Sequence, residues 1–127
     1  MQHKQRLTKR RDFASVYRKG RAFAHPLIAL RLIPNQLPCS RFGFVVSKAV
    51  GKAVVRNLVR RRLREGLRTL PVVPGWDIVV IARPKAAAAD FQALRRAAAG
   101  LLLRAGALES GAGSGQTAAA ETEITGE

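Results

Sequence analysis

The chain has 127 residues, which suits one domain, and 47% of them are hydrophobic. Its 23 Lys and Arg against 8 Asp and Glu give a formal net charge of +15, which predicts a polyanionic partner: nucleic acid first, an anionic membrane surface second. There is no run of about 18 apolar residues, which excludes a membrane-spanning helix, and a single cysteine excludes an internal disulfide.

The N-terminal part begins with residues 1–9, which are basic and polar and predict a flexible arm without the apolar segment of a signal peptide. We therefore expect a cytoplasmic protein. Residues 10–19 predict a short helix, because Phe13, Val16 and Tyr17 recur at the spacing of one helical face, and Gly20 can cap its end.

Two interpretations of Phe13 and Tyr17 remain open at this point. Aromatic side chains on one helical face usually belong to a core. They can also form a platform on which unpaired bases stack, and the neighbouring Arg10, Arg11 and Arg18 suit such a role.

Strands are expected next. Residues 23–33 are rich in Leu, Ile and Ala and predict one strand, with Pro26 at its start or at an edge because proline cannot donate to a ladder. Residues 34–38 contain two prolines and predict a turn. Residues 41–47 predict a second strand, in which Phe42, Phe44 and Val46 alternate toward the core.

A strong amphipathic helix is predicted over residues 54–70, ended by Pro71. At about 100° per residue, six apolar positions form one stripe that we expect to pack on the sheet: Val55, Leu58, Val59, Leu63, Leu67 and Leu70. Five polar positions fall together on the opposite side: Asn57, Arg60, Arg61, Arg64 and Arg68. Clustered charge of one sign, with only Glu65 nearby, predicts binding to phosphates rather than an ordinary solvated face.

The C-terminal part predicts a buried strand at residues 76–82 and a helix at residues 87–103. Residues 106–127 hold four Glu and no Lys or Arg, so the preceding part of the chain carries +19, and their composition predicts a disordered acidic tail. The order helix, strand, strand, helix, strand, helix indicates an α+β domain over residues 1–105, with a small mixed sheet packed against helices.

Catalytic residues are not evident in the sequence. His3 lies in the expected arm and His25 has no carboxylate near it in the sequence. A lone Cys39 and two histidines cannot make a zinc site, and we expect the cysteine to be structural. The sequence therefore predicts no catalytic residue and no metal ligand on the chain itself.

Three segments resemble the bacterial ribonuclease P protein family, in the right order over about the first 105 residues. The longest is FGFVVSKAVGKAVVRNLVRRRLRE at residues 42–65, similar to the family's strand ending V-S-K followed by its R-N-R helix. The others are RLTKRRDFASVYRKGR at residues 6–21, with the D-F-x-x-V-[FY] spacing, and WDIVVIARP at residues 76–84.

The resemblance implies an α+β fold with a left-handed βαβ crossover, against the usual right-handed rule. It implies that the arginine helix docks on the catalytic RNA, and the family's RNA-facing positions match Arg56, Asn57, Arg60, Arg61 and Arg64. Lys52 and Arg68 are assigned to the same contact. It also implies a cleft for the single-stranded 5′ leader of precursor tRNA, and the residues assigned to it are Phe13, Tyr17, Ser47, Lys48, Arg10 and Arg11.

The implied function is that of the protein subunit of ribonuclease P, assisting endonucleolytic 5′ maturation of tRNA. Catalysis is then expected from the RNA and its Mg²⁺ ions, and no obligate protein partner is expected. Three alternatives stay open on the residues alone: a small ribosomal protein, a duplex DNA-binding protein, and an autonomous nuclease.

The chain departs from the family pattern at three positions. The third member of R-N-R is Leu58, so one charge is missing from the arginine helix. Lys52 stands where Asn is common, and Arg31 stands where an aromatic residue can occur on the first strand. The first of these departures leaves the individual RNA contacts undecided.

Overall fold

The structure is a computed structural model that describes residues 6–109. Its elements in chain order are α1 (Arg10–Lys19), β1 (Arg21–Ala24), β2 (Ile28–Pro34), β3 (Arg41–Val45), α2 (Ala53–Arg68), β4 (Trp76–Ala82), the 3₁₀ helix η2 (Pro84–Ala88) and α3 (Phe91–Ala105).

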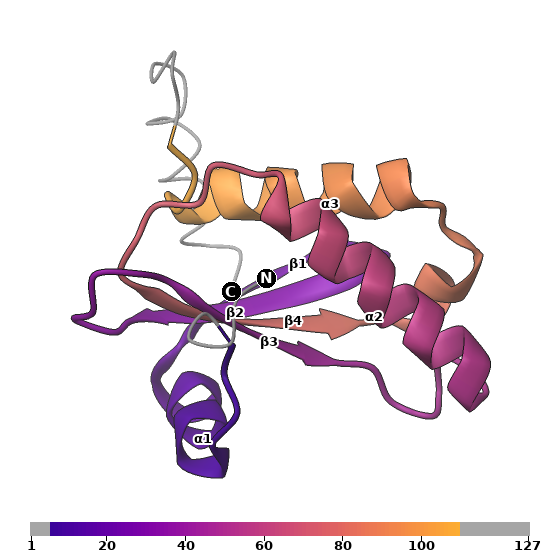
Figure 1. Cartoon of the computed structure of the whole chain (residues 1–127), viewed down its shortest axis with the longest axis horizontal. Coiled ribbons are helices and arrows are strands. Elements are labelled where there is room, and N and C mark those ends of the chain that lie inside the picture. Colours follow the sequence, from indigo (N-terminus) through magenta and orange to yellow (C-terminus); the bar gives the residue numbers. More distant parts are fainter. Residues whose placement is uncertain (1–5, 110–127) are drawn as a thin grey trace.

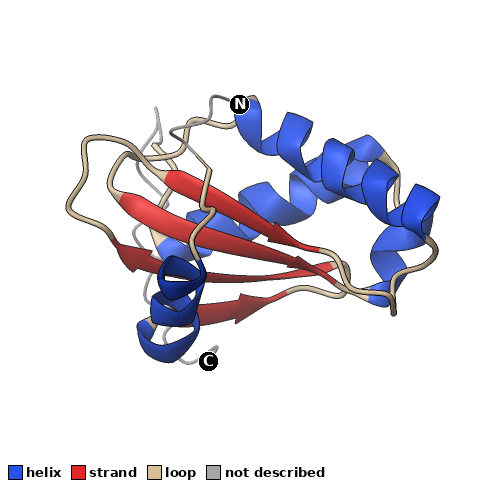
Figure 2. Cartoon of the chain, turned by 60° about the horizontal axis from the view of Figure 1, so that its bottom comes forward, coloured by secondary structure: helices blue, strands red, loops and turns tan. Residues whose placement is uncertain are grey.

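The four strands form one mixed sheet in the order β1-β2-β4-β3, in which only β3 and β4 run parallel. Helix α1 lies on one face of the sheet, and α2 and α3 cover the other (Figures 1 and 2). Most of the core lies under α2 and α3, where both helices bury apolar side chains against the sheet. A smaller cluster, built on Leu7, Val16 and Val79, fixes α1 to the opposite face. The structure thus confirms an α+β fold.

The strand predicted over residues 23–33 was wrong, because the structure splits it into the antiparallel hairpin β1–β2. His25 and Ile28 close the turn, since the His25 N–H donates to the Ile28 carbonyl at 2.9 Å. Pro26 stands inside this turn, where it needs no ladder partner. The chain therefore has one strand more than predicted, and both strands still turn their large residues toward the core.

The helix predicted over residues 87–103 is also divided. Asp90 separates η2 from α3, because its carboxylate accepts the N–H of Ala93 at 2.8 Å and caps α3. Gly106 ends α3 in the left-handed conformation, with φ of 79°.

Both ends of the described chain are more ordered than expected. Leu7, placed in the predicted flexible arm, is buried, and its N–H donates to the Phe42 carbonyl of β3 at 2.8 Å. Ala107 is also buried, and Leu108 pairs with Val72. Apolar contact orders these residues although their neighbours are polar. The remainder of the predicted acidic tail, residues 110–127, lies outside the described residues.

The β3-α2-β4 unit sets the orientation of the arginine helix. β4 is central and nearly all buried, as its continuous apolar run predicts, and β3 pairs beside it in parallel register. The left-handed sense of this crossover stays a prediction. No helix in residues 6–109 has the length and apolar character needed to cross a bilayer.

A pair of glycine substitutions tests how α1 is seated. A Cβ at Gly43 of β3 would lie 2.5 Å from the ring of Phe13, so Gly43→Ala should push α1 outward and lower the free energy of unfolding by about 1–3 kcal/mol. Gly100, exposed within α3 with nothing near its Cβ position, is the control. Gly100→Ala should raise the free energy of unfolding by about 1 kcal/mol. Urea denaturation measures the free energy of unfolding of both variants. If the two substitutions changed it by the same amount and in the same direction, the close packing of Phe13 on β3 would be contradicted.

Candidate nucleic-acid interface

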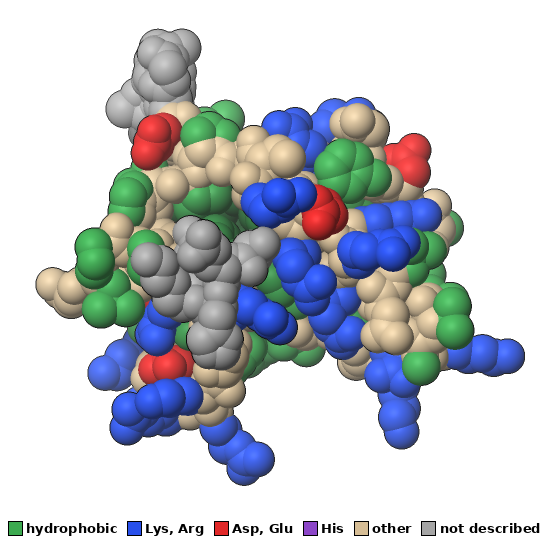
Figure 3. Space-filling model, viewed as in Figure 1, with side chains coloured by type: hydrophobic (Ala, Val, Ile, Leu, Met, Phe, Trp, Pro, Cys, Tyr) green, Lys and Arg blue, Asp and Glu red, His purple; other side chains and the backbone are tan. Residues whose placement is uncertain are grey.

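Helix α2 buries one side and exposes an arginine-rich side. Val59, Leu63 and Leu67 are buried against the core, as predicted. The opposite side borders a shallow depression of about 550 Å³, and its lining consists of Val54, Asn57, Leu58, Arg60, Arg61 and Arg64. In the space-filling view, Lys and Arg side chains gather over α2 (Figure 3). Four of the five polar residues predicted to share this side of the helix therefore line one depression: Asn57, Arg60, Arg61 and Arg64.

Leu58 does not belong to the buried stripe to which it was assigned. It is half-buried, is absent from the core clusters, and lines the depression with the arginines. The reason is helical geometry: Leu58 precedes the fully buried Val59 and is therefore rotated by about 100° from it.

Some of the helix's arginines make internal contacts. The Nε of Arg56 donates to the Gly51 carbonyl at 3.1 Å, and Nη1 of Arg62 donates to the Ala89 carbonyl at 2.8 Å. Arg68 forms an ion pair with Glu65, and its hydrogen bond lowers the pKa of the Glu65 carboxyl. Arg68, predicted to bind RNA, thus has its charge compensated within the helix.

The carboxylates of the described chain leave the other arginines uncompensated. Asp12 and Asp77 both pair with Arg41, and Asp90 caps α3. Within residues 6–109, no carboxylate lies within ion-pair distance of the three arginines that line the depression, Arg60, Arg61 and Arg64. An exposed cationic face without internal counter-charges is the arrangement that phosphate binding requires.

A second candidate surface is a groove of about 310 Å³ between α1 and the open face of the sheet. Its lining includes Tyr17 of α1, small residues of the β1–β2 hairpin, Arg31 and Ile81. Tyr17 is 41% exposed. The guanidinium of Arg31 lies 5.6 Å from the centre of its ring and donates to the Tyr17 carbonyl at 2.6 Å. The groove therefore offers an aromatic ring, a cation and an apolar floor.

The other residues predicted to form the cleft do not line this groove, and they lie at different places around it. Phe13 packs on Gly43 in the small cluster under α1 and does not line the groove. Ser47 and Lys48 are exposed just after β3, whose last residue Val45 pairs with Ile81 of the groove floor. Two further predicted residues, Arg10 and Arg11, are exposed at the start of α1, and Lys52 is exposed at the start of α2.

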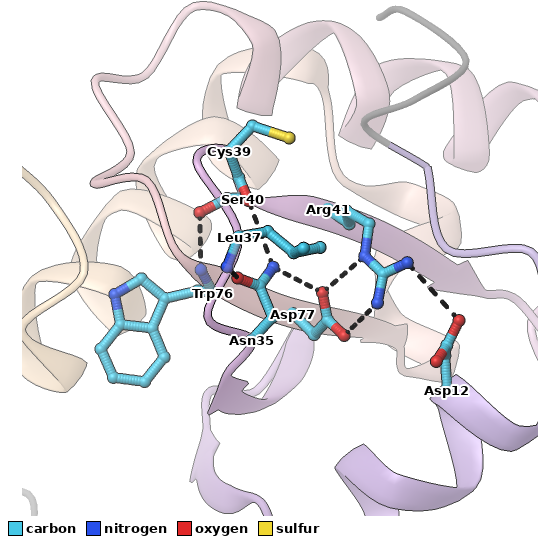
Figure 4. A network of polar contacts seen from close by, with 8 residues as sticks. All are labelled: Asp12, Asn35, Leu37, Cys39, Ser40, Arg41, Trp76 and Asp77. Carbon is cyan, nitrogen blue, oxygen red and sulfur yellow. Dashed lines mark hydrogen bonds and ion pairs between the residues drawn. The ribbon is translucent and has the colours of Figure 1, made fainter.

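A buried polar network ties α1 to the sheet (Figure 4). Asp77 of β4, only 4% exposed, accepts hydrogen bonds from Arg41 Nε at 2.9 Å and Arg41 Nη2 at 2.7 Å. Asn35 Nδ2 donates to the same carboxylate at 2.8 Å, and Arg41 Nη1 lies 3.5 Å from Asp12 of α1. The hydrogen bonds to Asp77 raise the pKa of Arg41. Sequence reasoning missed this network, because its members lie far apart along the chain.

Metal-binding clusters are not found in the described part of the chain: no three His, Cys, Asp or Glu side chains of residues 6–109 group closely enough to hold an ion. Cys39 is a free, partly buried thiol. Trp76 packs against the core, as its position at the start of β4 predicts.

Comparison with known proteins gives a consistent result. The model of the family Ribonuclease P matches residues 1–106. The ribonuclease P protein component of Dehalococcoides mccartyi strain CBDB1 is 46% identical over 105 residues, covering 83% of this chain and 88% of the relative. That of Roseiflexus castenholzii is 41% identical over 112 residues, covering 86% and 92%.

Solved structures agree with the sequence matches. The RNase P protein of Staphylococcus aureus superposes with a TM-score of 0.75 at 29% identity, covering 83% of this chain and 98% of that one. The Thermotoga maritima RNase P protein gives a TM-score of 0.71 at 34% identity, covering 76% and 94%. The alternative of a small ribosomal protein is not favoured by these matches. The chain belongs to the bacterial ribonuclease P protein family, and its role is therefore that of the protein component of the endoribonuclease that processes the 5′ end of tRNA.

Proposed function

We propose that the chain binds two RNAs on two separate surfaces. The arginine face of α2 binds the catalytic RNA of ribonuclease P, and the groove between α1 and the sheet holds the single-stranded 5′ leader of precursor tRNA. The observation that carries the proposal is the uncompensated arginine face of α2, set on the side of the helix opposite the core.

The arginine face suits a folded RNA backbone. Arg60, Arg61 and Arg64 project from one rigid helix, so their spacing is fixed before binding. Each planar guanidinium can donate two parallel hydrogen bonds to one phosphate. Neutralising phosphates in this way releases counter-ions, so binding should weaken steeply with salt.

The groove suits an unpaired strand rather than a duplex. Tyr17 offers an exposed ring on which a base can stack, and Arg31 lies beside it to meet a phosphate or a base edge. Lys48 is exposed just after β3, whose last residue Val45 pairs with Ile81 of the groove floor, so it can contact the backbone of the same strand. Bases held in a duplex could not reach this ring, because they are stacked on each other.

Catalysis itself we assign to the RNA and its Mg²⁺ ions. Mg²⁺ prefers carboxylate and phosphate oxygens, and the carboxylates of Asp12, Asp77 and Asp90 are all engaged inside the protein. The chain's own residues would offset the repulsion between phosphates and hold the leader in place. This role should lower the Mg²⁺ concentration that cleavage requires. We place the complex in the cytoplasm, where bacterial precursor tRNA is made.

Reconstitution tests the proposal directly. Precursor tRNA cleavage is measured at low Mg²⁺ with the RNA alone, with the protein alone, and with both. We expect efficient cleavage only with both. Cleavage by the protein alone would indicate an autonomous nuclease. If the protein did not increase cleavage by the RNA, the proposed role would be refuted.

Tyr17 tests the leader groove separately. Tyr17→Ala removes the exposed ring, and we expect the holoenzyme's Kd for precursor tRNA to rise by about tenfold, since stacking on one aromatic ring contributes about 1–3 kcal/mol. Tyr17→Phe keeps the ring and serves as the control. Binding of tRNA without a leader should not change in either variant. If Tyr17→Ala weakened both RNAs equally, the groove would not be the leader site.

A further inference from the structure

Two apolar side chains, one exposed and one half-buried, line the depression among the arginines of α2. Val54 is 78% exposed, and Leu58 follows four residues later, so both lie on the same helical face. Neither belongs to a core cluster, unlike Val55, Val59 and Leu63 of the same helix. Their role is therefore not to stabilise the protein core. A surface that binds only phosphates would have no use for them.

The rim of this apolar floor consists of hydrogen-bond donors. Nη1 of Arg60 donates to Oδ1 of Asn57 at 3.1 Å, and the amide nitrogen of Asn57, which lines the depression, has no acceptor within residues 6–109. Arg61 is exposed beside it. The Nε of Arg64 is buried and has no acceptor in the part of the chain that the structure describes. An acceptor-rich ligand would complement this rim.

The R-N-R pattern that this helix resembles has an arginine where Leu58 stands, so the apolar character of this position is a departure of this chain from the pattern. This chain has an apolar side chain there instead, which extends the apolar floor next to Val54. The exchange favours a flat, uncharged group at a site still surrounded by cations.

We propose that this depression receives one unpaired guanine of the RNA that α2 binds. The base would lie flat on Val54 and Leu58, with its O6 and N7 toward the donors of Asn57 and Arg61. Guanine fits the donor-only rim because this edge carries two acceptors, whereas adenine and cytosine present an amino group there. The inference rests on the proposed function, since it requires α2 to contact the catalytic RNA.

A salt titration separates the apolar contact from the ionic ones. The Kd of the full chain for its ribonuclease P RNA is measured over a series of KCl concentrations. Leu58→Ser should raise the Kd by about tenfold at every concentration and leave the log–log slope unchanged, because an apolar contact releases no counter-ion. Leu58→Arg should steepen the slope by about 0.7–0.9.

Leu37→Ser is the matched control, since Leu37 is 42% exposed in the β2–β3 loop and does not line the depression. Its binding should equal that of the unchanged chain. A Leu58→Ser variant that binds like the control, or whose defect vanishes at high salt, would overturn the inference.

The base is identified by replacing guanosine in the RNA with 7-deazaguanosine, which lacks the N7 acceptor. We expect one position at which this replacement weakens binding of the unchanged chain and no longer does so for Leu58→Ser. Absence of any such position would overturn the choice of guanine. The double variant Arg60→Glu with Arg64→Glu distinguishes failure of this inference from failure of the proposed function. If the proposed function is wrong, this variant binds ribonuclease P RNA with unchanged affinity. If only the guanine site is wrong, this variant still binds the RNA more weakly.

Discussion

Replacing Arg60 and Arg64 together by glutamate should raise the Kd for ribonuclease P RNA by about a hundredfold or more. Both arginines line the depression on α2 and have no carboxylate partner within residues 6–109, so their charges are available to phosphate. A hydrogen bond to a charged group contributes about 1.5–3 kcal/mol, and two lost contacts account for the factor before repulsion is added. Filter binding at several salt concentrations measures the affinity and shows a shallower slope.

The control for this variant is Lys85→Glu with Arg96→Glu, which changes the net charge equally. Both residues are exposed, on η2 and α3, outside the depression. We expect only a small loss of affinity, owing to the lower overall charge. Both double variants should unfold at the same urea concentration as the unchanged chain, because none of the four side chains belongs to the core. Equal losses of affinity in the two variants would mean that net charge, and not the face of α2, determines binding.

Asp77→Ala should lower the free energy of unfolding by about 2–4 kcal/mol. The substitution removes the partner of Arg41 and the acceptor of Asn35 in one step, and breaking a buried ion pair costs about 3–5 kcal/mol. The side chain of Arg41 is 24% exposed, so water offsets part of the loss. Because the pKa of Arg41 is raised above its ordinary value, the cation contributes at every pH below that value, and the loss should be the same at pH 6 and pH 9.

The double variant Arg41→Met with Asp77→Ala distinguishes an ion pair from simple packing. Its loss of stability should be smaller than the sum of the two single losses, because the second change no longer leaves a charge without a partner. Since Arg41 also reaches Asp12 of α1, each single variant should disturb the groove and weaken leader binding. Additive losses would show that the two residues act independently.

How far the sequence predicts this protein is clearest on α2. The helical phase of residues 54–70 follows from periodicity alone, and the structure confirms that Val59, Leu63 and Leu67 are buried while Arg60, Arg61 and Arg64 are not. Leu58 is the exception: it lies at the edge of the predicted apolar stripe, about 100° of rotation from Val59, and lines the depression instead.

Errors in the strands have a different origin. One apolar run at residues 23–33 looked like a single strand, because strand propensity does not reveal where a chain reverses. Pro26 predicts a strand start or an edge, but its place in the turn of a hairpin depends on the pairing between β1 and β2. Tyr17 was identified as a candidate stacking residue, while Phe13, seated on Gly43, was not separable from it by spacing.

The sequence by itself determined the charge of the chain, the amphipathic character of α2 and the family, because these depend on residues close together along the chain. Only the tertiary structure decided which carboxylates meet which cations, since Asp12, Arg41 and Asp77 come from α1, β3 and β4, respectively. The same holds for the groove beside Tyr17, which needs α1 laid across the sheet. Contacts between distant segments depend on how elements pack, and local periodicity carries no information about that packing.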